Sequence, residues 1–131
     1  MSDPRRDPYF NARRALAQLE AFIQQSRHNE MDRAAVIQAF EFTFEAFWKS
    51  LKKMVEAQGQ LAPFPRTAIA GAFQLGLITD EDTWLDMIRD RNQTSHVYNE
   101  EVSRAIYTNI TSRYVKAFQQ SIRSTPTPPG R

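Results

Sequence analysis

The sequence predicts an all-α fold, an antiparallel bundle of four to five helices. Apolar residues recur every three to four positions along five separate segments, which is the spacing of one helix face. Residues typical of helix N-caps precede several of these segments. No stretch alternates apolar and polar residues as a strand would. We expect one helical domain over residues 1–123 and a disordered tail over 124–131, which has three prolines and no apolar anchor.

The first two expected helices cover residues 8–25 and 31–57. Asp7 followed by Pro8 is typical of an N-cap with proline at the first helical position. The apolar face of the second helix is wider than one packed neighbour requires, because Ile37 and Phe42 extend it. This width predicts either a central helix or a subunit interface.

Three shorter helices are expected after the second. Pro63 and Pro65 predict a connection over residues 60–66, because proline cannot continue a helix. The next helix is expected over 67–77. The segment Thr79–Asp82 resembles a capping box, and Asn99 resembles a second cap. The last two helices are therefore expected over 80–97 and 100–122.

Composition narrows the class of protein. At 131 residues the chain has the length of one domain, and its formal net charge of +2 does not by itself require a nucleic-acid partner. The absence of cysteine excludes a disulfide framework and any thiolate metal site, and it agrees with the cytoplasmic location that we expect. No apolar run is long enough to span a membrane, and the first residues do not resemble a signal peptide.

The segment from Arg91 to Tyr98 carries the chemistry, with the spacing Arg-x4-His-x-Tyr. Arginine suits phosphate because its planar fork donates two parallel hydrogen bonds and stays charged. His96 titrates near neutral pH, so it can remove a proton and return one. In RNA the 2′-hydroxyl is an internal nucleophile, so this pair could cleave the chain without a metal or cofactor. Asn92 could orient His96 through a hydrogen bond, and Ser95 could contact phosphate.

The helical spacing within this segment suggests how the groups would meet. On one unbroken helix Arg91 and Tyr98 project almost together, whereas Arg91 and His96 are offset by about 140°. A second copy of the helix, related by a twofold axis, would place Arg91 and His96 of both subunits in a shared cleft. The sequence therefore favours a homodimer if the pair is catalytic.

A purely structural interpretation explains many of the same residues. An arginine and a histidine near a helix end can cap carbonyl groups and pack, with no chemistry of their own. Other residues with functional potential are expected to be structural: His28 in a solvated turn, and Trp48, Trp84, Tyr107 and Tyr114 in helix packing.

The chain resembles the HEPN proteins, and more narrowly the nucleotidyltransferase substrate-binding proteins associated with HepT toxins. The resemblance covers about residues 10–122. The features that carry it are the aromatic segment 40–49, the segment 65–69, Trp84, Met87 and the motif of residues 91–98.

This resemblance implies a homodimeric helical bundle that acts as a metal-independent endoribonuclease without a cofactor. Arg91 would bind phosphate and His96 would act as general acid and base. A cognate nucleotidyltransferase, the antitoxin, would attach AMP to Tyr98 and silence the toxin. In an alternative hypothesis, the protein is a non-enzymatic subunit that presents a nucleotide or substrate to a separately encoded nucleotidyltransferase.

Overall fold

The computed structural model describes residues 3–93 and 99–124, and every regular element within them is helical. The predicted all-α fold is therefore confirmed. A short 3-10 turn precedes the first of the α-helices. The elements are the turn Pro4–Arg6, α1 (Phe10–Gln25), α2 (Glu30–Ala57), α3 (Pro65–Gln74), α4 (Glu81–Asn92), α5 (Glu100–Asn109), a π-helical turn (Ile110–Tyr114) and α6 (Val115–Ile122).

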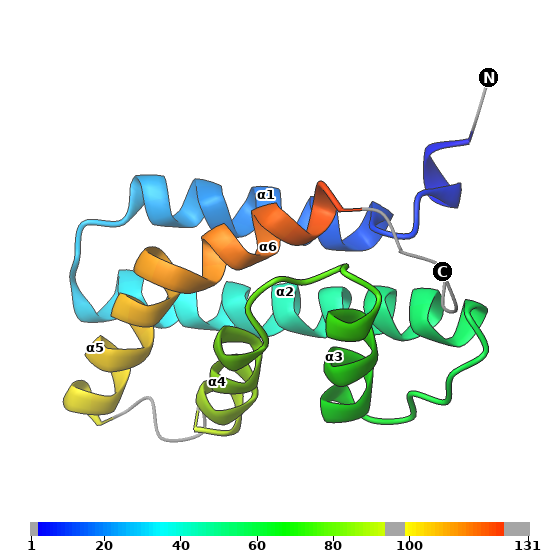
Figure 1. Cartoon of the computed structure of the whole chain (residues 1–131). Helices are drawn as coiled ribbons and strands as arrows, with labels where there is room; N and C mark the ends of the chain where they lie inside the picture. The colour runs from blue at the N-terminus through cyan, green and yellow to red at the C-terminus, as the bar shows by residue number, and fades with distance from the viewer. Residues whose placement is uncertain (1–2, 94–98, 125–131) are drawn as a thin grey trace.

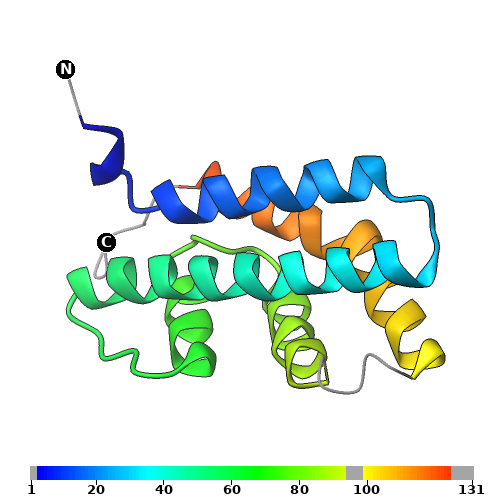
Figure 2. The ribbon, with the colours of Figure 1, turned by 180° about the vertical axis from the view of Figure 1, so that it is seen from behind.

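The long helix α2 organises the molecule. Helices α1 and α2 pack side by side in antiparallel directions, and α6 lies along α1 (Figure 1). Helices α3, α4 and α5 stand next to one another, crosswise to α2, and the view from behind shows the same arrangement (Figure 2). Helix α2 contacts α1, α3 and α5, which agrees with the central position expected from its wide apolar face.

Aromatic side chains hold α2, α4 and α6 together. The rings of Phe47 and Phe118 are stacked with centroids 4.5 Å apart, and Trp84 meets Phe118 edge-on at 5.4 Å. Such pairs add to the free energy gained from apolar burial. Trp84 is thus a core residue, as predicted. Phe42 remains 63% exposed, so the width of the α2 face is only partly explained by packing within the chain.

The predicted helix caps are largely confirmed. The side chain of Asn29 accepts a hydrogen bond from the Asp32 backbone N–H at 2.8 Å, and Asn99 caps α5 in the same way. At the start of α4 the cap is Asp80, one residue later than the capping box suggested, and it accepts from the Thr83 N–H at 3.1 Å. These bonds satisfy N–H groups that lack partners within a helix.

Two predicted boundaries at helix starts are wrong by two residues. Helix α1 begins at Phe10 rather than at residue 8, because the Asp7 carboxylate accepts from the Tyr9 N–H and holds a turn there. Helix α3 begins at Pro65 rather than at residue 67. Proline is compatible with the first turn of a helix, where its missing N–H would have had no partner.

Four further predictions need correction. The helix expected to end at residue 77 ends at Gln74, and Gly76 follows with a positive φ of 76°. The helix expected over 80–97 ends at Asn92, with Gln93 as its C-cap. The angular relation predicted for residues 91–98 assumed one continuous helix and no longer applies. The helix expected over 100–122 is present, but the π-helical turn divides it.

The structure describes only the first residue of the tail that we expected over 124–131. Ser124 still belongs to the folded part, where its hydroxyl donates to the Ser121 carbonyl at 2.6 Å. The rest of the expected tail, 125–131, lies outside the described residues. Among the described residues, no helix combines the length and apolar character needed to cross a bilayer.

Candidate phosphate-binding site at the end of helix α4

Arg91 lies in the last turn of α4 and reaches across to α2. Its Nη2 donates to Glu45 Oε2 at 2.9 Å, and its guanidinium lies 5.8 Å from the centre of the Phe44 ring. Both contacts restrict the rotation of a long side chain, and the second is within the range of a cation–π interaction. The side chain is 36% exposed, so a ligand arriving from solvent can reach it.

Glu45 is the residue that connects Arg91 to other charged and polar groups on α2. It accepts from Trp48 Nε1 at 3.1 Å and pairs with Lys49 Nζ at 3.2 Å. Partial burial opposes ionisation, but hydrogen bonds from Trp48 and Lys49 and the charge of Arg91 outweigh it and lower the pKa of Glu45. At neutral pH one carboxylate therefore lies between two cations, which leaves the cluster with a net positive charge.

Asp90 precedes Arg91 and points the opposite way, into the protein. It is only 4% exposed. Its carboxylate accepts from the Tyr114 hydroxyl at 2.5 Å and from Asn109 Nδ2 at 2.9 Å, and Arg89 Nε lies 3.4 Å away. Burial and the bond to Asp90 raise the pKa of Tyr114, so this hydroxyl keeps its proton and acts as a donor.

The π-helical turn explains how both partners reach Asp90. Residues five apart in an α-helix, such as Asn109 and Tyr114, are offset by about 140°. Within this turn the Val115 N–H bonds to the Ile110 carbonyl, five residues back, so positions five apart come closer to the same side. Asp90 therefore connects the last turn of α4, which carries Arg91, to the π-helical turn.

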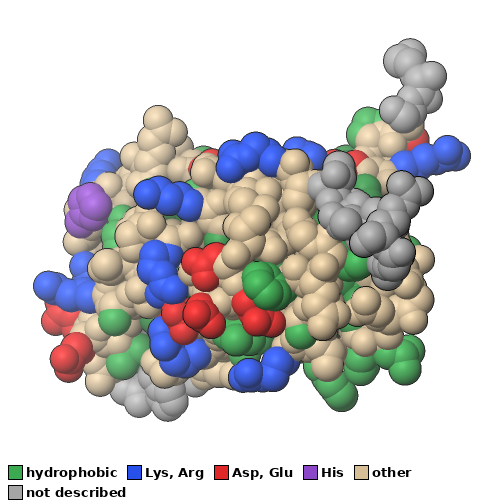
Figure 3. Space-filling view, viewed as in Figure 1, with side chains coloured by type: hydrophobic (Ala, Val, Ile, Leu, Met, Phe, Trp, Pro, Cys, Tyr) green, Lys and Arg blue, Asp and Glu red, His purple; other side chains and the backbone are tan. Residues whose placement is uncertain are grey.

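Ion pairs reinforce the same contact nearer the surface. Asp86 pairs with Arg113 of the π-helical turn at 2.7 Å and with Arg89 at 3.3 Å. Arg113 also donates to Thr83 Oγ1 at 3.1 Å. Acidic and basic side chains gather together over α4 and α6 in the space-filling view (Figure 3). The pairs of Arg113 fix α4 against the π-helical turn, and the acidic and basic side chains together do not form a surface of one sign.

The structure places only part of the predicted site. Arg91 has the contacts described above, and Asn92 is exposed as the last residue of α4. Ser95, His96 and Tyr98 lie outside the described residues. The predicted pairing of Arg91 with His96, and the predicted modification site at Tyr98, therefore remain predictions.

Two residues of this site were missed by the sequence analysis. No local pattern marks Glu45, because it is 46 positions from Arg91 and meets it only through the packing of α4 on α2. Asp90 did carry a signal: it follows Met87 by three positions and Thr83 by seven, in phase with the buried side of α4. A carboxylate on an apolar face predicts a buried group with dedicated hydrogen-bond donors.

Fold and site together define a small, all-helical domain with an anchored arginine at the end of one helix, and comparisons with known proteins identify its class. The family model described as "nucleotidyltransferase substrate binding protein like" matches residues 8–125. A crystal structure from Thermus thermophilus is 36% identical, with a TM-score of 0.78 over 86% of this chain and 96% of that one. The chain therefore belongs to the nucleotidyltransferase substrate binding protein like family.

Two matches come from Haemophilus influenzae. One is a solved structure described as the fold of a substrate binding domain of a nucleotidyltransferase; it is 23% identical, with a TM-score of 0.66 over 88% of this chain and 92% of that one. The other is a curated protein called "Probable ribonuclease HepT", 30% identical over 82 residues. The match spans 59% of this chain and 56%, about half, of that relative. The predicted likeness to the HEPN and HepT-type group is confirmed.

Proposed function

We propose that this chain is the toxin of a HEPN/nucleotidyltransferase toxin–antitoxin pair and that it acts as a metal-independent endoribonuclease. The observation that carries the proposal is the position of Arg91, which Glu45 and Phe44 anchor at the end of α4, immediately before the remainder of the motif. A relative named as a probable ribonuclease supports the same function, and the family description supports a link to a nucleotidyltransferase.

In this proposal Arg91 binds the scissile phosphate of RNA. Its guanidinium is already oriented by α2, so less conformational entropy is lost when it binds a ligand than for a free side chain. The planar fork can hold two phosphate oxygens and stabilise the charge that develops on them in the transition state. Glu45 is a positioning residue, because it would act on the phosphate only through Arg91.

His96 is the proposed general acid and base. It takes the proton of the 2′-hydroxyl, whose oxygen attacks phosphorus. The bond from phosphorus to the 5′-oxygen breaks, and that oxygen receives a proton from the histidine. The products are a 2′,3′-cyclic phosphate and a free 5′-hydroxyl. In this proposal Asn92 orients His96, and Ser95 contacts the phosphate.

A homodimer is part of the proposal. Because α4 ends at Asn92, the angular offset expected for one helix through residues 91–98 does not support the pairing of Arg91 with His96. A twofold axis would still allow the two subunits to bring two copies of each residue to one cleft. RNA would bind across that cleft.

Tyr98 is the proposed site of silencing. Its phenolic oxygen would attack the α-phosphate of ATP, held by the cognate nucleotidyltransferase, and pyrophosphate would leave as the phenol loses its proton. The product places bulk and negative charge beside a site built for phosphate. Coexpression with an active nucleotidyltransferase is expected to add the mass of one AMP group to the peptide that contains Tyr98. An unmodified peptide would contradict this assignment.

The direct test in cells is growth after induction of the protein alone. The parent is expected to arrest growth, and Arg91→Ala and His96→Ala are expected to permit it at matched soluble levels. Arg104→Ala is the matched control, because it removes the same side chain from an exposed position on α5, outside the motif and away from Asp90. Full toxicity of His96→Ala would show that the catalytic assignment is wrong.

The second candidate function is a non-enzymatic subunit that presents a nucleotide or substrate to a nucleotidyltransferase. The family description favours it, and Arg91 could bind phosphate without chemistry at His96. The two candidates differ at His96. A binding subunit would cause no arrest, and its nucleotide affinity would fall in Arg91→Ala and persist in His96→Ala.

A further inference from the structure

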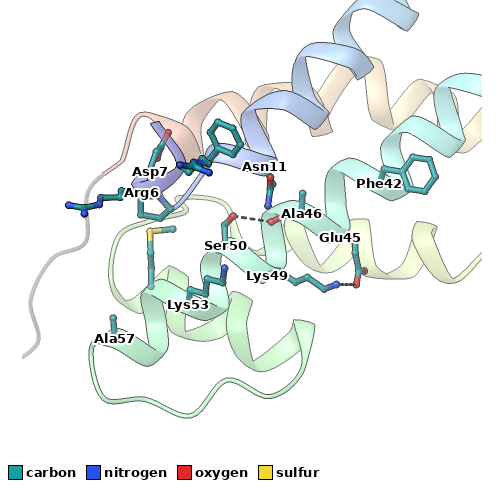
Figure 4. Close-up of a pocket in the computed structure, with 14 residues that line it drawn as sticks. Arg6, Asp7, Asn11, Phe42, Glu45, Ala46, Lys49, Ser50, Lys53 and Ala57 are labelled. Atoms are coloured by element: carbon teal, nitrogen blue, oxygen red, sulfur yellow. Dashed lines mark hydrogen bonds and ion pairs between the residues drawn. The ribbon is translucent and has the colours of Figure 1, made fainter. Parts of the chain in front are cut away.

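We propose that a groove on the outer face of α2 binds single-stranded RNA and guides it across Arg91. The groove lies between α2, the N-terminal turn Pro4–Arg6 and the start of α1, and encloses about 830 Å³ (Figure 4). This inference rests on the proposed ribonuclease function for the class of its substrate, but its geometry is independent of residues 94–98.

The groove contains more positive charge than negative. Arg5, Arg6, Lys49 and Lys53 line it, against two acidic residues, Asp7 and Glu45. Both acids are already paired: Asp7 with Arg13 at 2.6 Å, and Glu45 with Arg91 at 2.9 Å. Arg5 is paired with Asp3 at 3.1 Å and Lys49 with Glu45 at 3.2 Å, so the charge that is available to a polyanion is that of Arg6 and Lys53.

Two of these cations have no acidic partner among the described residues. Arg6 and Lys53 are both exposed, and neither forms an ion pair there. Figure 4 shows them on opposite sides of the groove, Arg6 on the N-terminal turn and Lys53 on α2. A strand lying in the groove would contact phosphate-binding groups from both sides.

The order of side chains along α2 gives the groove a direction. Positions 42, 45, 49 and 53 are three or four apart, so they share one face of the helix. Each step of four residues advances about 6 Å, which is comparable to the distance between phosphates in an extended single strand. Arg91 does not itself line the groove, but it contacts Glu45, which lies in this row between Phe42 and Lys49.

Phe42 provides an exposed aromatic ring on which a base of single-stranded RNA could stack. Its ring is 63% exposed and lies on the groove, although burial would have stabilised it. Sites that bind single strands combine a cationic groove with exposed aromatic rings on which bases stack. A base on Phe42 and phosphates on Lys49 and Lys53 would bracket the phosphate held by Arg91.

A second copy of the chain fits this surface less well than RNA does. If the groove faced its own copy across a twofold axis, the same cations would oppose one another. An apolar protein partner would have to bury Arg6 and Lys53 without acidic partners in the groove, which is costly. The charge of the groove therefore favours a polyanion.

The test is binding of a fluorescein-labelled 12-nucleotide oligouridylate with 2′-O-methyl groups, measured by anisotropy. This probe cannot be cut, because its 2′-oxygen has no proton to lose. We expect Arg6→Glu with Lys53→Glu to weaken binding by about thirtyfold or more, and Phe42→Ala by about tenfold. Arg66→Glu with Lys116→Glu changes the net charge equally, away from the groove, and is expected to have a much smaller effect.

The neutral double variant Arg6→Ala with Lys53→Ala tests the mechanism with less risk to folding. The slope of log affinity against log salt is expected to become shallower by about 1.4, since each phosphate contact on a single strand contributes about 0.7. An equal loss of binding in groove and control variants would overturn the proposal. A change in molar mass on light scattering in the groove variants would overturn it too, because the groove would then be a contact between copies.

Binding and cleavage measured together show whether the groove assignment or the ribonuclease function fails. If the parent binds the probe through the groove but cuts no RNA, the groove assignment stands and the ribonuclease function fails. If the parent cuts RNA and the groove variants bind and cut as it does, the function stands and the groove assignment fails.

Discussion

Asp90 and Arg91 are neighbours in sequence with opposite environments. Asp90 is buried and accepts from Tyr114 and Asn109, whereas Arg91 reaches outward to Glu45. A buried carboxylate is costly unless donors surround it, so the last turn of α4 can adopt few alternative arrangements. The rigidity of that turn positions Arg91, and the chemistry proposed for Arg91 depends on it.

Removing the Tyr114 hydroxyl tests this anchor. Tyr114→Phe is expected to lower the free energy of unfolding by about 1–3 kcal/mol at pH 7, because a buried carboxylate loses a donor. Urea unfolding measures the loss. Tyr107→Phe, on the adjoining helix α5, is the matched control, and its smaller expected loss reflects a 3.2 Å bond to Ser26 at a partly buried position.

The same variant has a predicted pH dependence. The pKa of Tyr114 is raised in the folded state, whereas the unfolded chain releases this proton near pH 10. The stability contributed by Tyr114 is therefore fully present below about pH 10 and declines above it. The gap between the parent and Tyr114→Phe is expected to be smaller at pH 11 than at pH 7. An unchanged gap would contradict this role.

At the scale of helices, α2 and α3 approach each other closely at a glycine. A Cβ at Gly71 would lie 2.6 Å from Val55 Cγ1, which is shorter than any packed contact allows. Overpacking of this kind costs about 1–3 kcal/mol, against a gain in helix propensity of about 1 kcal/mol for alanine over glycine. Gly71→Ala is therefore expected to destabilise the protein by about 1 kcal/mol in thermal or urea unfolding.

A double-mutant cycle identifies the cause. Val55→Ala removes the methyl group that would clash, so the double variant Gly71→Ala with Val55→Ala is expected to be more stable than the sum of the single effects predicts. Additive effects would mean that the contact between α2 and α3 does not constrain position 71.

The sequence predicted that the helices exist better than it predicted where they end or change their hydrogen bonding. Apolar periodicity predicted each of the helices because each buries one face. The end of α4 at Asn92 was missed, because residues 93–97 contain neither glycine nor proline to mark a stop. The π-helical turn was also missed. Thr111 and Ser112 donate to carbonyls of the preceding turn, but such bonds occur in ordinary helices as well.

At the scale of the whole molecule, the candidate site combines a local motif with residues brought together only by folding. The motif of residues 91–98 could be recognised from sequence, because its spacing is local. Glu45, the groove on α2 and the exposed ring of Phe42 depend on how distant segments pack, which no spacing rule gives. The family match over residues 8–125 covers the motif and Glu45, but not Arg5, Arg6 and Asp7 of the groove.

The most direct measurement is cleavage of RNA by the purified protein with the ends of the products mapped. The parent is expected to leave 2′,3′-cyclic phosphate and 5′-hydroxyl ends, and to leave the 2′-O-methyl form of the same sequence intact. Arg91→Ala and His96→Ala are each expected to reduce the rate by about a hundredfold or more, and Arg104→Ala to change it little. Cleavage of the 2′-O-methyl strand, or a parental rate in His96→Ala, would contradict a ribonuclease built on Arg91 and His96.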